Sequence, residues 1–281
     1  MTNNETARPA AGTDRCLDAT EARIAQAFRA RGRAFIPYVV AGEPSLEQTT
    51  RLVTAAIENG ADLIEVGIPF SDPTAEGEVT KQAGLRALKR KTAPDDVFRI
   101  VRSVRLAGAT CPIALVSYAN VVFAYGTDRF MKACAEAGAE AVMLLDVPLE
   151  EREEFSRPAA SHGICIPSVV YPAPEQRLAE IARAAEGFIQ FTCPPGLPEQ
   201  HVRSLVETVR AHASVPVAVA CENADALEAG ALADCADGLT VNAEITERML
   251  KGGLESAAAY VRETAASVHG VIHSNRPRNR S

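Results

Sequence analysis

The feature that most constrains the fold of this chain is a regular alternation of short apolar runs with longer amphipathic stretches. Eight runs rich in Val, Ile, Leu and Ala have the length and flanking residues typical of buried strands. They are Phe35–Val40, Leu63–Val66, Ile113–Ser117, Ala141–Leu145, Ile164–Val170, Gly187–Phe191, Val217–Ala220 and Gly238–Val241. The pattern between them predicts amphipathic helices, among them Leu46–Asn59, Pro94–Leu106, Thr127–Ala137 and Glu199–Ala213.

Strands that alternate with helices predict an α/β protein with a parallel sheet. Eight such units favour a closed (β/α)8 TIM barrel over an open doubly wound sheet, and the length of 281 residues suits one domain of this kind. Gly60 and Gly138 each follow a predicted helix, where a left-handed cap is expected. We assign the barrel to residues 21–270, a flexible polar extension to residues 1–20 and a basic tail to residues 271–281.

Composition and charge exclude several classes of function. The formal net charge of −7 argues against nucleic acid as a partner. No apolar stretch approaches the roughly 20 residues that span a bilayer. The opening residues, MTNNETARPAAGTDR, contain no apolar signal core, so we expect a cytoplasmic protein with no membrane partner. The seven cysteines include no CxxC pair, which indicates reduced thiols and no metal site.

Chemistry in a barrel of this type belongs at the C-terminal ends of the strands. Glu65 lies at the end of the second predicted strand, between Ile64 and Val66, and the following loop carries Glu76 and Glu78. A carboxyl group does acid/base work best when desolvation raises its pKa toward neutrality, and Glu65 is placed for that. The alternative for Glu65 is a rim carboxylate paired with Arg or Lys. Glu78 is either part of the site or an exposed loop acid.

Four stretches of the chain resemble the tryptophan synthase alpha chain family. IEVGIPFSDPTAEGE (64–78) resembles the second strand and loop of that family, and FIPYVVAGEPSLEQT (35–49), VSYANVVFAYGTDRF (116–130) and LLDVPLEE (144–151) resemble the first, third and fourth. The matches are in register and span about residues 22–165. The resemblance implies retro-aldol cleavage of indole-3-glycerol phosphate to indole and glyceraldehyde-3-phosphate, without a metal or organic cofactor.

The resemblance also implies roles for two carboxyl groups. The family's glutamate at the end of the second strand does acid/base work at the ring carbon and the side-chain hydroxyl, and Glu65 occupies that position. The family's loop aspartate takes up the indole N–H, and Glu76 stands in its place. Because catalytic groups must be held within about 0.5 Å of a productive geometry, the extra methylene of Glu76 predicts an altered substrate. Glu78 stands where the family usually has proline.

The family's phosphate-binding glycines are changed in the second half of the chain. After the seventh strand, Cys221 aligns with one of these glycines and Glu222 follows it. In the shortened sixth loop, TCPPGLPEQ, Gly196 is the residue that retains a candidate phosphate-facing amide. A phosphate favours bare amides at a helix N-terminus, so these side chains predict the loss of tight phosphate binding.

The eighth strand departs from the family in the same direction. Its Gly-Ser pair is replaced by Asn242 and Ala243, and Glu244 follows. We therefore place Asn242 and Glu244 among the residues that meet the altered end of the substrate. The alternative is that Glu244 complements a helix dipole and Asn242 caps that helix.

Three further side chains are candidates for the substrate pocket. Tyr38 and Tyr118 offer ring faces or hydroxyl donors, with ordinary barrel packing as the alternative. Gln190 falls where the family tends to have tyrosine, which suggests a more polar substrate.

The resemblance further implies a partner. Asp72, Pro73, Asn120 and Pro148 resemble positions at which family members face their PLP-dependent beta chain. We favour a diverged carbon–carbon lyase that acts on a small, indole-like, non-phosphorylated substrate in specialised biosynthesis. The alternatives are a weakly active subunit that activates a beta-chain-like enzyme, and a barrel enzyme that runs another acid/base reaction such as a cyclisation or an isomerisation.

Overall fold

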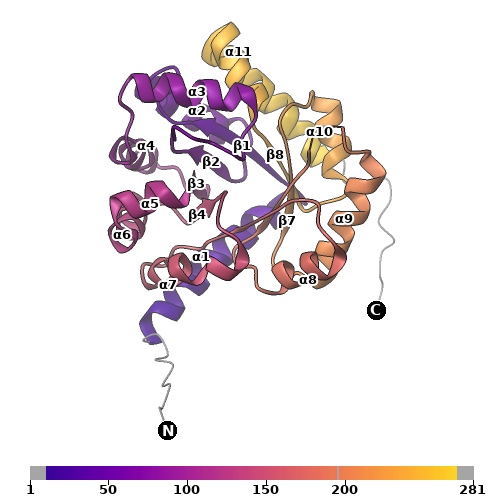
Figure 1. Cartoon of the computed structure of the whole chain (residues 1–281). Helices are drawn as coiled ribbons and strands as arrows, with labels where there is room; N and C mark the ends of the chain where they lie inside the picture. Colours follow the sequence, from indigo (N-terminus) through magenta and orange to yellow (C-terminus); the bar gives the residue numbers. More distant parts are fainter. Residues whose placement is uncertain (1–10, 195, 271–281) are drawn as a thin grey trace.

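The computed structural model describes residues 11–194 and 196–270. Its centre is an eight-stranded parallel sheet in the order β4-β3-β2-β1-β8-β7-β6-β5. The strands are β1 (Ala34–Val40), β2 (Ile64–Gly67), β3 (Ile113–Ser117), β4 (Ala141–Leu144), β5 (Ser168–Val170), β6 (Ile189–Thr192), β7 (Val217–Cys221) and β8 (Gly238–Val241). The two edge strands meet through an isolated parallel bridge between Ala141 and Cys165. The sheet is therefore a nearly closed (β/α)8 barrel, as the sequence predicts (Figure 1).

All eight predicted strands are present, with small differences at their ends. The largest difference is at β5, which was expected to begin at Ile164 and begins at Ser168. Pro167 directly precedes Ser168 and has no N–H to donate to a neighbouring strand, so the regular ladder starts only after it.

Helices follow the strands and cover the outside of the barrel (Figure 1). They are α1 (Ala11–Ala30), α2 (Leu46–Glu58), α3 (Glu78–Lys89), α4 (Pro94–Leu106), α5 (Ala119–Tyr125), α6 (Thr127–Ala137), α7 (Glu153–Ser161), α8 (Glu175–Arg183), α9 (Glu199–His212), α10 (Ala226–Ala233) and α11 (Ala243–Gly270), with a short 3₁₀ helix, η1 (Leu149–Glu151). The four helices predicted above end within one residue of their expected bounds. Gly138, with φ 92°, caps α6 in the left-handed conformation, and Gly60 has φ 107° after α2.

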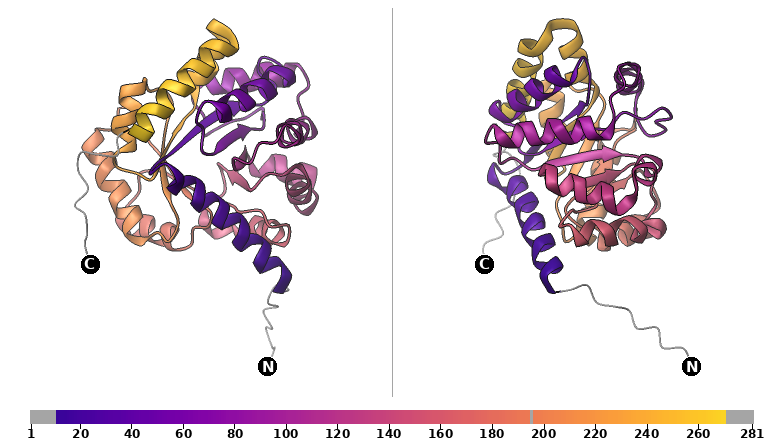
Figure 2. Two further views of the ribbon diagram at one scale, coloured as in Figure 1. Left: turned by 180° about the vertical axis from the view of Figure 1, so that it is seen from behind. Right: turned by 90° about the vertical axis from the view of Figure 1, so that its left-hand side faces the viewer.

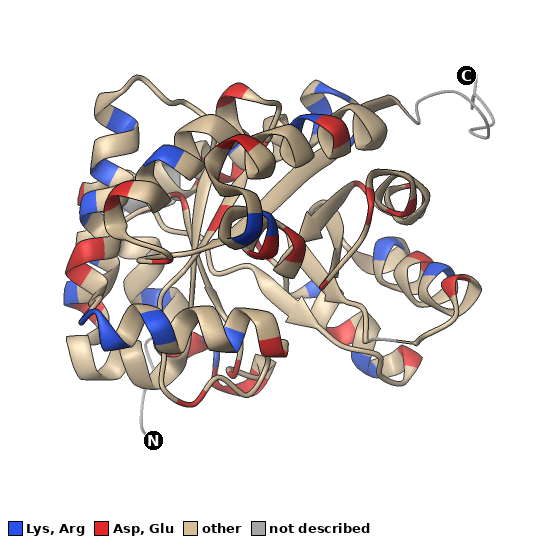
Figure 3. Ribbon diagram, turned by 90° about the horizontal axis from the view of Figure 1, so that it is seen from above, with Lys and Arg blue, Asp and Glu red and all other residues tan. Residues whose placement is uncertain are grey.

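Alternate residues of each strand point to opposite faces of the sheet, which produces two apolar clusters. Ile64 and Val66 belong to the cluster between the strands and the helices. Ile36, Met143 and Phe188 belong to the cluster inside the barrel. Most charged residues lie on the outside, and Figure 3 shows acidic and basic residues side by side along the outer helices.

The first helix closes one end of the barrel. Ile24 and Phe28 of α1 are buried in the interior cluster, and Figure 2 shows α1 lying across that end. Thr20 Oγ1 donates to Gly163 O at 2.8 Å, which ties the middle of the helix to the loop before β5. The polar extension expected over residues 1–20 thus overlaps α1 from Ala11 onward. The remainder of that extension, and the expected basic tail over residues 271–281, lie outside the described residues.

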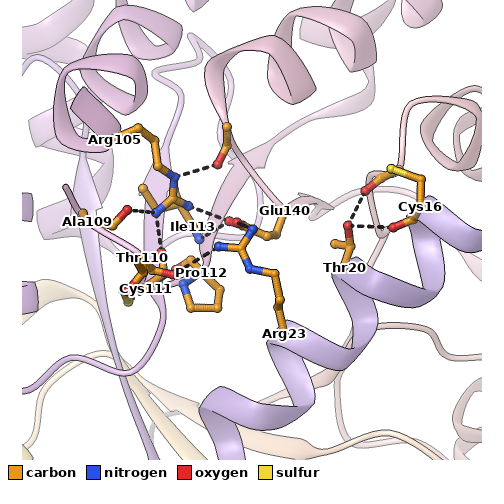
Figure 4. Close-up of polar contacts among 12 residues, drawn as sticks. Cys16, Thr20, Arg23, Arg105, Ala109, Thr110, Cys111, Pro112, Ile113 and Glu140 are labelled. Carbon is orange, nitrogen blue, oxygen red and sulfur yellow. Dashed lines mark hydrogen bonds and ion pairs between the residues drawn. The ribbon is translucent and has the colours of Figure 1, made fainter. Parts of the chain in front are cut away.

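Acidic residues that precede the even-numbered strands fix the N-terminal ends of the odd-numbered strands. Each accepts a hydrogen bond from a backbone N–H at 2.8–3.1 Å, in the pairs Asp62–Phe35, Glu140–Ile113, Glu186–Ile166 and Asp237–Val217. Each of these acids also pairs with an arginine. Figure 4 shows the Glu140 cluster, in which Arg105 and Arg23 reach the two carboxylate oxygens at 2.7 and 2.8 Å. In barrels this end of the strands serves stability and leaves the opposite end for chemistry.

Among the helices described, none is long and apolar enough to cross a membrane.

Candidate active site

Glu65 lies inside the barrel as the second of the four residues of β2, one position earlier in the strand than the sequence predicts. Its neighbours in register are Tyr38 on β1 and Ala114 on β3, and its side chain points away from the outer apolar layer that holds Ile64 and Val66. Only 1% of the residue is exposed. Burial raises the pKa of Glu65 to about 8, with a small opposing effect from a hydroxyl of Thr240. At neutral pH this carboxyl is therefore mainly in its acid form.

The contacts of Thr240 agree with a protonated Glu65. Thr240 Oγ1 lies 3.1 Å from Gln190 Oε1 and 3.4 Å from Glu65 Oε1. A hydroxyl group has a single proton, so Thr240 cannot donate to both oxygens at once. A protonated Glu65 removes the conflict, because its O–H can donate to Thr240 while Thr240 donates to Gln190. The other carboxyl oxygen, Glu65 Oε2, is buried and has no hydrogen-bond partner among the described residues.

Glu76 is held by two tyrosine hydroxyls in the loop between β2 and α3. Tyr38 donates to Oε1 at 2.5 Å and Tyr118 donates to Oε2 at 3.4 Å. Burial raises the pKa of Glu76, and these two donors oppose the rise. The candidate tyrosines of β1 and of the loop after β3 thus meet on the candidate carboxylate of the β2 loop. Burial raises the pKa of Tyr38 and Tyr118 as well, so both phenols keep their protons.

Glu222 reaches the same loop from the opposite side of the mouth. It follows β7, and its Oε1 accepts a hydrogen bond from Gly77 N at 3.2 Å. Strands β1 and β8 lie between β2 and β7 in the sheet, so this contact crosses the mouth of the barrel. Burial raises the pKa of Glu222, while the Gly77 amide and the nearby Lys81 oppose the rise.

Several members of this cluster were not predicted from the sequence. They are Thr240, which links Glu65 to Gln190; Gly77, which donates to Glu222; Lys81, whose charge acts on Glu76 and Glu222; and Phe70, whose ring lies 5.0 Å from that of Tyr118. The sequence could have indicated Thr240, because it lies two residues before the candidate Asn242, and alternate residues point to the same face of a strand. No sequence pattern indicates the contact of Gly77 with Glu222, because the two residues are 145 positions apart.

Four predicted substrate residues lie apart from the Glu65–Glu76 cluster or at its edge. Cys221 and Gly196 line a cavity of about 450 Å³ between α9 and α10, and Glu222 lines the same cavity. Asn242 keeps a buried Oδ1 without a hydrogen-bond partner among the described residues. Glu244 is in the first turn of α11 and pairs with Arg248 at 2.6 Å, which favours its alternative role on the helix. Glu78 is exposed in the first turn of α3.

The four residues expected to face a partner lie in the segments that follow three neighbouring strands. Asp72 and Pro73 follow β2, Asn120 is in α5 after β3, and Pro148 follows β4. These strands are adjacent in the sheet. Asp72, Asn120 and Pro148 are exposed, and Pro73 is partly buried.

The fold and the site together define a class of protein: a (β/α)8 barrel with buried carboxyl groups in its interior, of the kind that carries enzyme active sites at the C-terminal ends of its strands. The model of the tryptophan synthase alpha chain family matches residues 24–273. The chain belongs to this family, whose members are lyases.

Individual relatives agree with the family match along most of the chain. The tryptophan synthase alpha chain of Ralstonia nicotianae is 35% identical over 261 residues, which are 89% of this chain and 98% of the relative. That of Opitutus terrae is 37% identical over 234 residues, 79% and 88% of the two chains. Among solved structures, tryptophan synthase subunit alpha from Legionella pneumophila superposes with a TM-score of 0.82 at 29% identity, covering 91% of this chain and 98% of that one. A chain of tryptophan synthase from M. tuberculosis gives the same score and identity, with 88% and 98% covered.

Proposed function

We propose that this member of the family cleaves a carbon–carbon bond in an indole-glycerol substrate that carries no phosphate. The observation that carries the proposal is the Glu222 carboxylate. It follows β7, where the family resemblance implies a phosphate-binding loop, and it accepts a hydrogen bond from Gly77 N at 3.2 Å. Glu65 and Glu76 supply the acid/base chemistry of the family reaction.

Cleavage requires one proton to be added and one to be removed. The ring carbon that leaves must gain a proton, and the hydroxyl on the adjacent side-chain carbon must lose one. The electron pair of the broken bond returns to the ring, and the hydroxyl carbon departs as an aldehyde. Glu65 suits both transfers, because its pKa of about 8 keeps a proton available at neutral pH. After donating to the ring carbon, its carboxylate can take the hydroxyl proton and return to the acid form.

Glu76 stabilises the ring while it carries positive charge. A carboxylate that accepts the ring N–H lowers the energy of the protonated ring, and it must be ionised to do so. The hydroxyls of Tyr38 and Tyr118 favour the ionised form of Glu76. The two carboxyl groups therefore have environments that separate their roles, with Glu65 as the acid and Glu76 as the acceptor.

The charges at the mouth disfavour a phosphate. The negative charge of Glu222 raises the pKa of Glu76, and the positive charge of Lys81 lowers the pKa of both carboxyl groups. A like charge about 4 Å away costs roughly 4 kcal/mol at an effective dielectric constant of about 20. A hydroxyl or an amine has no such penalty, and it can donate a hydrogen bond to these carboxylates.

Calorimetric titration with glycerol-3-phosphate and indole-3-glycerol phosphate tests the missing phosphate site. We expect no binding of either compound at micromolar concentration, while the Ralstonia nicotianae alpha chain serves as the positive control. Micromolar binding that is lost in Gly196→Pro would show that a phosphate site survives, and the proposal would then be abandoned.

A second candidate function is activation of a beta-chain-like PLP enzyme. The observation that favours it is the arrangement of Asp72, Asn120 and Pro148 as exposed residues on three adjacent loops of one rim. Co-purification with the beta-like chain encoded nearest to this one is the test. A shared elution peak at micromolar concentration supports the pairing, and separate peaks reject it.

A further inference from the structure

We propose that Glu222 is a positioning residue that holds Glu76 in place by fixing the Gly77 amide from across the barrel mouth. The inference rests on the proposed function for the role of Glu76, but the contact itself can be tested without any substrate. Glu222 Oε1 accepts from Gly77 N at 3.2 Å, and Gly77 directly follows Glu76.

The backbone of Glu222 is itself anchored, so its side chain extends from a fixed base. Ala243 N donates to Glu222 O at 2.7 Å, and Asn242 N donates to Cys221 O at 3.2 Å. These bonds tie the end of β7 to the start of α11. The β2 loop is thereby connected through one carboxylate to the β7 and β8 side of the mouth.

The glycine at position 77 is explained by this contact and not by backbone conformation. Gly77 has φ −73° and ψ 168°, which any residue can adopt. A Cβ at this position would lie 2.2 Å from Glu222 Oε2 and 2.4 Å from its Cδ. The carboxylate therefore packs directly onto the glycine, and a larger residue would displace it.

The position of Glu222 also affects the ionisation of Glu76. Five titratable groups from different parts of the barrel interact with Glu76: Tyr38, Tyr118, Tyr171, Lys81 and Glu222. The negative charge of Glu222 raises the pKa of Glu76, while the tyrosine donors and Lys81 lower it. Removing the charge of Glu222 while keeping its hydrogen bond must therefore lower the pKa of Glu76.

Two substitutions separate the hydrogen bond from the charge. Glu222→Gln keeps an oxygen that can accept from Gly77 N and removes the charge, whereas Glu222→Ala removes both. We would follow amide hydrogen exchange at Gly77, and titrate the Glu76 carboxyl by carbon NMR with Glu76→Gln for assignment. Glu228→Gln, at an exposed acid on α10, is the matched control.

The expected results differ between the variants. In Glu222→Ala the Gly77 amide should exchange about tenfold faster or more, as for the loss of one hydrogen bond. In Glu222→Gln the exchange rate should stay as in the wild type, while the pKa of Glu76 falls. Glu228→Gln should change neither quantity. Unchanged exchange in Glu222→Ala, or an unchanged pKa of Glu76 in Glu222→Gln, overturns the proposal.

A double-mutant cycle distinguishes the loss of the Glu222–Gly77 contact from a general destabilisation of the fold. Gly77→Ala alone should also speed exchange at residue 77, because its methyl group displaces the Glu222 carboxylate. Once Glu222→Ala is present, adding Gly77→Ala should have little further effect, since the contact is already gone. Fully additive effects would contradict a direct contact. Because no substrate is used, a failure here is distinct from a failure of the proposed lyase reaction.

Discussion

At the scale of single residues, the proposed chemistry depends on Glu65, a buried carboxyl group with few hydrogen-bond partners. Glu65 has one distant hydroxyl neighbour, Thr240, and an Oε2 without a hydrogen-bond partner in the described part of the chain. A group in such a position destabilises the fold when it ionises, and enzymes retain it because the reaction needs its raised pKa.

Glu65→Gln should therefore stabilise the protein above about pH 5 while removing its acid/base function. The pKa of Glu65 is about 8 in the folded protein against an ordinary value of 4.5. Between these values the folded state keeps a proton that the unfolded chain has lost, so the carboxyl lowers stability progressively as pH rises. Glutamine cannot ionise, and the variant should gain up to about 3 kcal/mol at pH 7. Urea unfolding at pH 4 and pH 7 measures this, and an equal difference at both pH values would contradict it.

The length of the Glu76 side chain determines where its carboxylate lies in the candidate site. Its carboxylate meets Tyr38 at 2.5 Å and Tyr118 at 3.4 Å, and aspartate would withdraw it by one methylene. Glu76→Asp should lower turnover of the non-phosphorylated substrate by about ten- to a hundredfold, in line with a lost charge-assisted hydrogen bond. It should also shift preference toward indole-3-glycerol phosphate. The control is Glu78→Asp, because Glu78 is exposed and lies two positions after Glu76. An unchanged substrate profile in Glu76→Asp would contradict a contact between Glu76 and the substrate.

At the scale of elements, the strands are held in register from the end opposite the site. Glu140 accepts from Ile113 N and pairs with Arg105 and Arg23. Glu140→Gln keeps an acceptor for the amide but leaves Arg105 without its anion, so we expect a loss of about 1–3 kcal/mol in unfolding free energy. Glu136→Gln, which breaks an exposed pair with Lys132, should change stability by less than about 0.5 kcal/mol. Chemical denaturation measures the unfolding free energy of both variants. Equal losses would show that the Glu140 cluster stabilises the fold no more than an exposed ion pair does.

The elements also show how far local sequence determines structure. The eight strands and the four named helices could be predicted, because their apolar periods match the faces that they bury. The start of α1 could not, because its first half is polar and is held by distant contacts, such as that of Thr20 with Gly163. At β5 the apolar run predicted a longer strand, but Pro167 cannot donate a backbone hydrogen bond, so the strand begins after it.

The candidate site divides in the same way. Glu65, Glu76, Tyr38 and Tyr118 could be found from strand ends and a family resemblance, and they lie together. The sequence did not reveal that Cys221, Gly196 and Glu222 line one cavity between α9 and α10, or that Glu222 accepts a hydrogen bond from the Gly77 amide. These facts depend on which way side chains point after the barrel has closed.

At the scale of the whole molecule, the site exists only because the barrel brings distant loops together. The mouth combines Tyr38 from β1, Glu65 and Glu76 from β2 and its loop, Tyr118 from the loop after β3, Glu222 from the β7 loop and Thr240 from β8. The first half of the chain supplies the carboxyl groups and tyrosines that would break the bond. The second half supplies Glu222, whose charge disfavours a phosphate in the function that we propose.

The most direct test of this account is the release of indole from indole-3-glycerol and from indole-3-glycerol phosphate, measured in parallel at pH 7. We expect a higher kcat/KM for indole-3-glycerol, the reverse preference for the Ralstonia nicotianae alpha chain, and a loss of about 10²–10⁴ in rate for Glu65→Gln. A preference for the phosphorylated compound, or full activity in Glu65→Gln, would contradict it.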